Sequence, residues 1–220
     1  MMEGYGPATM KKMLRLAGSA ENVFVKKDLW MSQVRKRGKA ALVLSVNDAL
    51  RRRVDEELRL MDRNGVRQCF YLDGDYPYRL KSCTDGPLAF YYQGSCDFNA
   101  PRMLAVVGTR EATEYGRSAV RKVLSDLGDA DVTTVSGLAY GIDTEAHSRS
   151  LEYGLRTLAV MGCGLGTVYP SQNRRLAAQI VEQGGSLVSE YSYQTQPDRL
   201  NFPRRNRIVA GMADAVLVAE

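Results

Sequence analysis

The sequence predicts an α/β protein, with an extended Rossmann-like parallel sheet covered by helices on both faces and preceded by a small helical module. Two observations support this prediction. From Met103 onward, short apolar runs alternate with amphipathic stretches, as in sheets whose strands are buried on both faces. Before residue 65, apolar residues recur at three-to-four spacing, which is typical of helices. We therefore expect a helical module at 1–64, a connecting segment at 65–102 and a Rossmann-like domain at 103–220.

Three helices are expected in the N-terminal module, at 8–18, 28–38 and 47–65, each ending at a glycine suited to a helix C-terminus. The stretch GYGPATMKKMLRLAG is similar to the second half of a helix-hairpin-helix or SAM-like module, in which a glycine turn offers backbone N–H groups to a phosphate. Simple helix packing explains the same stretch equally well. Residues 1–60 hold 13 Lys and Arg against 7 Asp and Glu, which favours an accessory contact with DNA.

The remaining elements follow in chain order. A strand is expected at 66–72, and a stretch typical of turns follows it at 73–95. In the Rossmann-like domain we expect five strands, at 103–108, 132–137, 156–162, 186–191 and 215–220. The helices between these strands are expected at 113–128, 143–154, 171–184 and 203–213.

Composition narrows the class of protein. The net charge is +5 and the pI is about 9.0, which permits binding to a polyanion without requiring it. The four cysteines form no C-x-x-C pair, and no apolar run is long enough for a signal sequence or a membrane span. We therefore expect a protein of the reducing cytoplasm.

Ligands of open α/β sheets bind where the parallel strands end, so the residues after each strand are the first candidates for a site. Here these residues are Gly108, Thr109 and Arg110, then Ser136 and Gly137, then GCGLG at 162–166, and finally the loop 190–202. Glycine lets backbone N–H groups approach a phosphate, although tight strand-to-helix turns also need glycine for steric reasons. Together with Arg110 and Ser136, the turns predict a phosphate-binding pocket.

Two other kinds of site match the sequence less well. GCGLG, with Glu190 placed 24 residues beyond Gly166, partly matches a dinucleotide-binding fingerprint, but it follows the third strand and Pro170 delays the helix. The single histidine, His147, follows Asp143 by four residues on an expected helix. This pair fits an acid-base or metal unit, but a hydrogen-bonded structural histidine is the commoner case. We assign no catalytic residue, cofactor or metal, and we do not expect an enzyme.

Longer blocks of the sequence resemble a known family. VVGTREATEYGR, VSGLAYGIDTEAHSRSLEYGLRTLAVMGCGLGTVYPSQNRRL, GGSLVSEY and FPRRNRIVAGMADAVLVAE are similar, in order and spacing, to successive blocks of the DprA/Smf family of bacterial DNA-processing proteins. YPYRLKSCTDGPLAFYYQG resembles the segment that leads into them, so the resemblance covers residues 76–220. It implies an extended Rossmann fold that binds single-stranded DNA without catalysis, protects incoming DNA during natural transformation and helps load the recombinase RecA. It also implies a homodimer.

The resemblance assigns ten DNA-binding residues. They are Gly108, Thr109, Arg110, Ser136, Gly137, Arg199, Phe202, Arg205, Asn206 and Arg207. Arginines at a helix start add bidentate phosphate contacts to its partial positive charge, and an aromatic face allows a base to stack. Asparagine and arginine also bond neighbouring backbone groups, so one or two residues of 204–207 are expected to serve the helix itself. Phe202 fits a place in the core equally well.

The DprA/Smf family usually continues past the strand at 215–220 with a further helix and strands. We therefore expect this chain to be truncated at its C-terminus and to lack part of the family's usual surface for dimerisation and RecA contact. The main alternative is a nucleotide-binding enzyme of the phosphoribohydrolase type, similar to the lonely-guy proteins. Those enzymes carry a P-G-G-x-G-T block, whereas this chain reads GCGLGTVYP, so hydrolysis of a nucleoside monophosphate is not expected.

Overall fold

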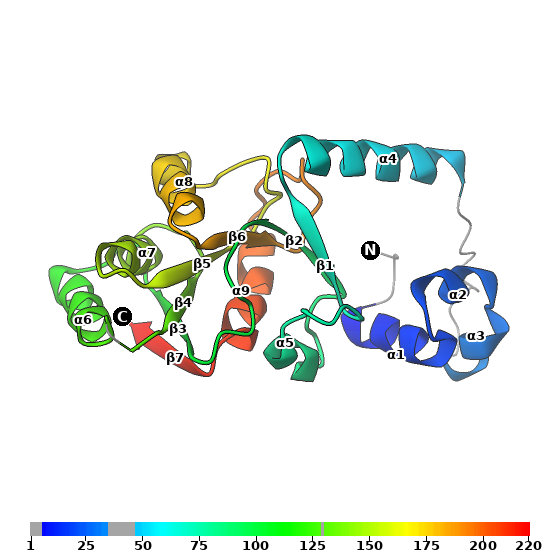
Figure 1. Ribbon diagram of the computed structural model, residues 1–220, viewed down its shortest axis with the longest axis horizontal. Helices are drawn as coiled ribbons and strands as arrows, with labels where there is room; N and C mark the ends of the chain where they lie inside the picture. Colours follow the sequence, from blue (N-terminus) through cyan, green and yellow to red (C-terminus); the bar gives the residue numbers. More distant parts are fainter. Residues whose placement is uncertain (1–5, 35–46, 129) are drawn as a thin grey trace.

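The structure, a computed structural model, describes residues 6–34, 47–128 and 130–220 (Figure 1). Its strands are β1 (Arg67–Phe70), β2 (Ala89–Gly94), β3 (Met103–Gly108), β4 (Thr133–Ser136), β5 (Arg156–Met161), β6 (Ser186–Ser189) and β7 (Ala215–Ala219). Its α-helices are α1 (Pro7–Ala17), α2 (Ala20–Val25), α3 (Asp28–Val34), α4 (Asp48–Arg63), α5 (Tyr78–Ser82), α6 (Glu114–Asp126), α7 (Ile142–Glu152), α8 (Arg174–Glu182) and α9 (Asn201–Gly211). A short 3-10 helix, η1 (Ser171–Asn173), precedes α8.

The described strands form one sheet in the order β1-β2-β6-β5-β4-β3-β7. The five strands from β6 to β7 in this order run parallel, and they correspond to the five strands expected from the sequence. The predicted fold class is therefore confirmed. β1 and β2 are antiparallel and extend the sheet beyond β6, because residues 91–94 of β2 pair with residues 186–189 of β6.

The sequence did not predict β2 or α5, which lie in the stretch expected to be turns. Phe90 and Tyr92 alternate with more exposed residues along β2, as in a strand that is half covered. The rings of both residues pack edge-on against Phe98, with centroid distances of 5.2 and 4.9 Å. Because β2 also pairs with β6, which is distant in the chain, tertiary contacts and not local propensity define the strand. The division of the chain at residues 64 and 102 stays a prediction.

Helices cover both faces of the parallel strands (Figure 1). β5 shows the division clearly, because its side chains alternate between two separate clusters. Leu158 and Val160 belong to the cluster that contains Ile208 and Val209 of α9. The intervening residues of β5 belong to the cluster of α8, and α6 and α7 pack on the same face as α8. The strand ends are therefore flanked by α9 on one side and by α6, α7 and α8 on the other.

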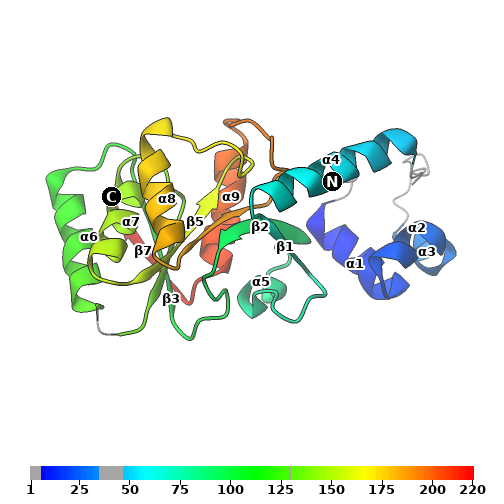
Figure 2. The same ribbon diagram turned by 45° about the horizontal axis from the view of Figure 1, so that its top comes forward.

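The helices before β1 lie at the opposite end of the molecule from β7 (Figures 1 and 2). α1, α2 and α3 share a small apolar cluster around Met13 and Trp30, and the Trp30 indole donates a 3.0 Å hydrogen bond to the carbonyl of Val23. The Lys11 ammonium of α1 donates to the carbonyl of Cys83 at 2.7 Å and so ties this cluster to the segment after α5. No helix of the described ranges is long and apolar enough to cross a membrane.

The N-terminal predictions hold in part. α1 and α4 coincide with the helices expected at 8–18 and 47–65, whereas α2 was not expected. The helix expected at 28–38 is present up to Val34, and its last four residues lie outside the described part of the chain. Most of the GYG turn at 4–6 lies outside it too, so the SAM-like nature of the module stays a prediction.

Candidate nucleic-acid interface

The loop after β3 is locked onto the start of α7. The Thr109 N–H donates to the carbonyl of Glu220, and the Thr109 carbonyl accepts from the Ile142 N–H, each at 3.1 Å. Gly141 has a φ of +74°, and a Cβ there would lie 2.2 Å from the Thr109 oxygen. Only glycine fits this position, because it tolerates both the positive φ and the close backbone contact. Arg110 leaves this fixed loop with its side chain exposed.

The turn after β4 is strained and held by many hydrogen bonds. Leu138 has a φ of +57°, a conformation that a branched residue adopts only when its surroundings impose it. Its carbonyl accepts from the Asn173 side-chain amide at 3.0 Å, and the next N–H, that of Ala139, donates to the Asp143 carboxylate at 3.2 Å. Ser136 is fully buried and donates to the carbonyl of Val106 at 2.6 Å. The turn is therefore a rigid part of the strand edge.

Arg205 supports this turn from below. Its side chain is only 3% exposed, and its guanidinium donates to the carbonyls of Gly137 and Val160. A Cβ at Gly137 would lie 2.3 Å from Arg205 Nη2, so Gly137 leaves the room in which the guanidinium sits. Burial lowers the pKa of Arg205, and the Asp143 carboxylate opposes this effect. For Asp143 the signs are reversed: burial raises its pKa, and Arg205 opposes the rise.

Arg207 is also engaged within the protein. Its Nη2 lies 2.5 Å from both carboxylate oxygens of Glu190, whose side chain is 7% exposed. Arg205 and Arg207 are thus structural, but their partners Gly137, Val160 and Glu190 lie outside α9, so these contacts serve the strand edge and not the helix itself. Asn206 is exposed, and its side-chain oxygen accepts from Arg205 Nε at 3.1 Å. Arg199 is exposed in the loop before α9.

A small hollow lies between the ends of β3, β4 and β5. It measures about 60 Å³ and is lined by Arg110, Gly137, Ala139, Tyr140, Tyr169, Pro170 and Phe202. The Arg110 guanidinium lies 5.6 Å from the centre of the Phe202 ring, within range of a cation–π interaction. Phe202 packs over Gly162, where a Cβ would lie 2.7 Å from its ring. Phe202 is thus half-buried and still lines the hollow, so it serves both packing and the surface.

The ten predicted residues therefore divide into two groups. Arg110, Arg199, Phe202 and Asn206 reach the surface, whereas Ser136, Gly137, Arg205 and the paired Arg207 build the framework beneath it. Gly108 also belongs to the framework, because a Cβ there would lie 1.9 Å from the Ala219 carbonyl oxygen of β7. The backbone of Thr109 bonds to Glu220 and to Ile142, and so it ties the loop that carries Arg110 to the framework. A direct contact of the framework side chains with DNA stays a prediction.

Sequence reasoning missed Tyr140 and Tyr169. Both are exposed at the hollow, Tyr140 by 41% and Tyr169 by 47%, and each lies in a loop after a parallel strand. The available signal was an aromatic residue in a loop that follows an expected strand. It was hidden because tyrosines are common elsewhere in the chain, which has 12 of them.

The glycines of GCGLG have a packing function. The Gly164 N–H donates to the carbonyl of Thr195, and the Gly166 N–H donates to that of Tyr193, each at 2.9 Å. A Cβ at Gly164 would lie 2.1 Å from the carbonyl oxygen of Ser192. Since the loop after β6 occupies these N–H groups, they are not available to a pyrophosphate, and the geometry does not favour the dinucleotide fingerprint.

His147 lies inside the protein. It is fully buried, and its Nδ1 lies 2.7 Å from the hydroxyl oxygen of Thr157. Its Nε2 has no hydrogen-bond partner among the described residues. Burial, reinforced by the charge of Arg205, lowers the pKa of His147 to about 3, so the imidazole is neutral at physiological pH. A structural histidine, the commoner of the two cases considered from the sequence, fits this setting.

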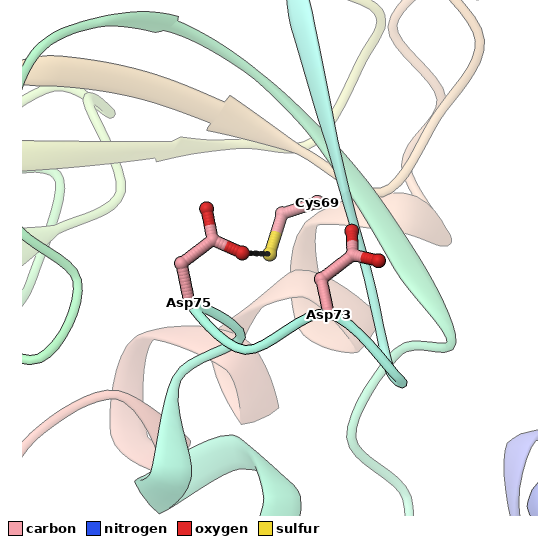
Figure 3. A group of neighbouring side chains, drawn as sticks. All are labelled: Cys69, Asp73 and Asp75. Carbon is pink, nitrogen blue, oxygen red and sulfur yellow. Dashed lines mark hydrogen bonds between the residues drawn. The ribbon is translucent and has the colours of Figure 1, made fainter.

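A second polar cluster lies away from the strand ends, on β1 and the turn that follows it (Figure 3). The Cys69 sulfur points toward Asp75, with 3.8 Å between Sγ and Oδ1, and Asp73 accepts from the Phe70 N–H at 2.7 Å. Burial and the two carboxylates raise the pKa of the Cys69 thiol to about 12. A thiol that stays protonated is a poor metal ligand, and Asp73 already stabilises the turn. We assign no ligand to this cluster.

Comparison with known proteins shows the relationships of the chain. The family model described as DNA recombination-mediator protein A matches residues 67–220. Protein Smf of Synechocystis sp. is 34% identical over 226 residues, which cover 100% of this chain and 56% of that protein. DNA processing protein DprA of Streptococcus pneumoniae is 41% identical over 149 residues, which cover 68% of this chain and 52% of that protein. The chain thus spans about half the length of these curated relatives.

Two solved structures share the fold. The X-ray structure of DNA processing protein A from Streptococcus pneumoniae aligns with a TM-score of 0.74 and 32% identity, over 100% of this chain and 75% of that one. The second is the structure of DNA processing protein A from Helicobacter pylori, which concerns the single-stranded DNA binding mode of that protein. It aligns with a TM-score of 0.61 and 27% identity. That alignment covers 70% of this chain and 68% of that one.

Proposed function

The chain belongs to the family of DNA recombination-mediator protein A, and we propose that it binds single-stranded DNA along the carboxyl edge of its parallel strands. The observation that carries the proposal is the exposed guanidinium of Arg110, which lies over the Phe202 ring beside an open hollow. A cation beside an aromatic side chain is a combination that binds single strands, because it offers one contact to the phosphate and one to the base.

The surroundings of Arg110 support a phosphate contact. Within the described residues, its guanidinium has no salt-bridge partner, in contrast to the paired Arg207. The backbone of the loop that carries Arg110 is fixed by hydrogen bonds on both sides, so the position of the Arg110 backbone is set before a ligand binds. Arg199 and Asn206 are exposed on the loop before α9 and on α9, the helix that also carries Phe202. A site of this kind binds without strong base preference, because stacking accepts every base.

The role in the cell that we propose follows from the family. We propose that the protein protects incoming single strands during natural transformation and helps load the recombinase RecA, in the cytoplasm and as a homodimer. We further propose that it acts by binding and not by catalysis. The buried, neutral His147 supports this view, because it cannot reach a substrate at the strand ends.

The alternative is a mononucleotide-binding hydrolase of the phosphoribohydrolase type. Such an enzyme needs backbone N–H groups free for a phosphate after β5, whereas those of Gly164 and Gly166 are bonded to the loop after β6. Incubation with a nucleoside monophosphate and analysis for the free base tests this alternative. Release of the base at a rate above background would favour the enzyme.

The proposal is tested by fluorescence anisotropy with a labelled oligo-dT and the matching duplex over a series of salt concentrations. Arg102→Ala is a matched control for Arg110→Ala, because the two exposed arginines flank β3 at opposite ends. We expect the wild type to prefer the single strand. Arg110→Ala should weaken binding and flatten the log-log salt slope by about 0.7, the value for one phosphate contact on a single strand. Equal losses in both variants, or a loss in neither, would contradict the proposed site.

A further inference from the structure

One face of α4 carries an apolar stripe that stays exposed. Leu50, Val54 and Leu58 recur every four residues along the helix, so they lie on one face of it. Their exposed fractions are 39%, 48% and 52%. α4 extends from the start of β1 away from the parallel strands (Figures 1 and 2), and its anchors among the described residues lie in its C-terminal half. There Met61 is buried, and the Glu57 carboxylate accepts from the Tyr193 N–H at 2.5 Å.

The stripe lines an open groove of about 670 Å³ between α4 and the sheet. The groove is lined on α4 by residues between Leu50 and Met61, and opposite them by Gln68, Tyr91, Ser192, Gln194 and Thr195. A single exposed leucine needs no explanation, but three aliphatic side chains along one groove form a continuous apolar surface. A helix with such a face ordinarily packs it against another element.

The charges of α4 are divided between its two halves. Residues 48–54 hold three arginines and one aspartate, whereas residues 55–63 hold four acidic residues and two arginines. In the run RRRVDEE at 51–57, each arginine precedes an acidic residue by four positions. This order stabilises a helix less than the reverse order does. No residue of α4 forms an ion pair within the described part of the chain. The charge pattern is therefore not explained by the stability of α4 itself.

We propose that α4 pairs with α4 of a second copy of this chain, in antiparallel orientation about a two-fold axis near Val54. The axis places Leu50 opposite Leu58 of the partner subunit, and it joins the two stripes at Val54. Arg51 and Asp55 lie on the same edge of the stripe, so each meets its opposite charge on the partner helix. A parallel pair would bring the two basic halves together, and the charges thus select the antiparallel orientation.

A second copy is the occupant that fits both the stripe and the charges. A nucleic acid would be attracted by the arginines at 51–53 and repelled by the acidic residues at 55–57. A two-fold pair instead uses the same patch on both chains, as isologous interfaces do, and α4 is complementary to itself in this way. α4 has 16 residues and is about 24 Å long, so the contact is small and the association should be weak and dependent on concentration. The inference does not rest on the proposed DNA site, and it names a surface for self-association.

Sedimentation velocity over a series of protein concentrations tests the pairing. The average mass of the wild type should rise with concentration. Val54→Arg places two like charges at the axis and should abolish the rise. Arg51→Glu should weaken the association about tenfold, because it sets like charges against each other at two symmetry-related places. Arg51→Glu combined with Asp55→Arg should restore the association. Arg52→Glu is the matched control, because it makes the same change of charge on the opposite face of α4 and should associate like the wild type.

Covalent cross-linking tests the register independently. With copper phenanthroline as the oxidant, Val54→Cys should form a disulfide-linked dimer, whereas Arg52→Cys should not. The outcome is refuting if the wild type keeps one mass at all concentrations, or if Val54→Arg and Arg51→Glu associate like the wild type. Failure of the double charge exchange to restore association, or equal cross-linking of the two cysteine variants, would overturn the antiparallel pair. None of these results touches the proposed DNA binding, which is measured separately with Arg110→Ala and a short oligo-dT.

Discussion

Replacing Gly137 with alanine should loosen the strand edge by displacing the Arg205 guanidinium. A Cβ at Gly137 would lie 2.3 Å from Arg205 Nη2 and 2.4 Å from its Cζ, closer than real contacts allow. Because the guanidinium ends a flexible side chain, it will move away before the backbone does. It then loses its hydrogen bonds to the carbonyls of Gly137 and Val160, and both carbonyls lose their charged partner.

The magnitude follows from these two bonds. A hydrogen bond to a charged group contributes about 1.5–3 kcal/mol to stability. The displaced guanidinium regains water, so the lower end of the range applies, and the free energy of unfolding should fall by about 3 kcal/mol. For a protein of this size, each kcal/mol lowers Tm by roughly 2–4 °C, so we expect a loss of roughly 6–12 °C.

Thermal and urea unfolding measure this change. Gly74→Ala is the matched control, because a Cβ at Gly74 would have no atom within 4 Å and its φ is outside the left-handed region. The decisive comparison is a double-mutant cycle with Arg205→Ala. In that background Gly137→Ala should cost less than about 0.5 kcal/mol, since no guanidinium remains to displace. A Gly137→Ala variant as stable as Gly74→Ala, or one with the same loss in both backgrounds, would refute the reasoning.

Three further outcomes are expected. Gly162→Ala places a Cβ 2.7 Å from the Phe202 ring and should push the ring out of the hollow, which lowers single-strand affinity about tenfold in anisotropy titrations; unchanged affinity would contradict this. Asn173→Ala removes the side chain that donates to the carbonyl of the strained Leu138, and it should lower the free energy of urea unfolding by about 2 kcal/mol. A change within experimental error would mean that the turn keeps its conformation without this hydrogen bond. Burial and the charge of Arg205 lower the pKa of His147 to about 3, so the unfolded chain binds the extra proton and stability falls as the pH drops below about 6.5. His147→Gln should remove a slope of up to about 1.4 kcal/mol per pH unit in urea unfolding between pH 6 and 5, and parallel slopes would argue against a buried neutral histidine.

The parallel part of the fold was predictable because burial on both faces leaves an unbroken apolar run. β5 reads RTLAVM and β6 reads SLVS, and both are short and adjacent to a glycine, which favours buried strands over helices. β2 was not predictable in the same way. Its aromatic residues follow two prolines and several aspartates, and it becomes a strand through pairing with β6 and packing on Phe98. Local signals cannot report a contact that is formed about 95 residues away in the chain.

The candidate site was predictable in its location but not in the function of each residue. Arg110 follows an expected strand and Arg205 lies near the start of an expected helix, yet the family resemblance assigns both to DNA binding. The structure separates them, because α9 crosses beneath the strand ends and carries Arg205 into the interior, where the carbonyls of Gly137 and Val160 receive it. Which arginine faces the solvent depends on the path of α9 relative to β4 and β5. That path is a tertiary property.

The strain at Leu138 gives the two groups of site residues different physical functions. A positive φ in a branched residue costs about 1–3 kcal/mol and persists only where the surroundings impose it. Here Asp143, Asn173 and Arg205, from three different elements, hold the turn. The backbone at the edge is therefore set before any ligand binds, whereas the exposed arginines would lose rotamer freedom only on binding.

This division predicts how variants of the two groups will differ. Changes beneath the turn, such as Gly137→Ala, should weaken DNA binding in proportion to the stability that they remove, because they act by moving the edge. Arg110→Ala should weaken binding and lower the unfolding free energy by no more than about 1 kcal/mol, since its side chain is exposed, makes no ion pair among the described residues and loses only the cation–π contact with Phe202. A plot of binding loss against stability loss for a set of variants should therefore show the framework residues on one line and Arg110 well above it. If Arg110→Ala fell on the same line, the distinction between framework and contact residues would be wrong.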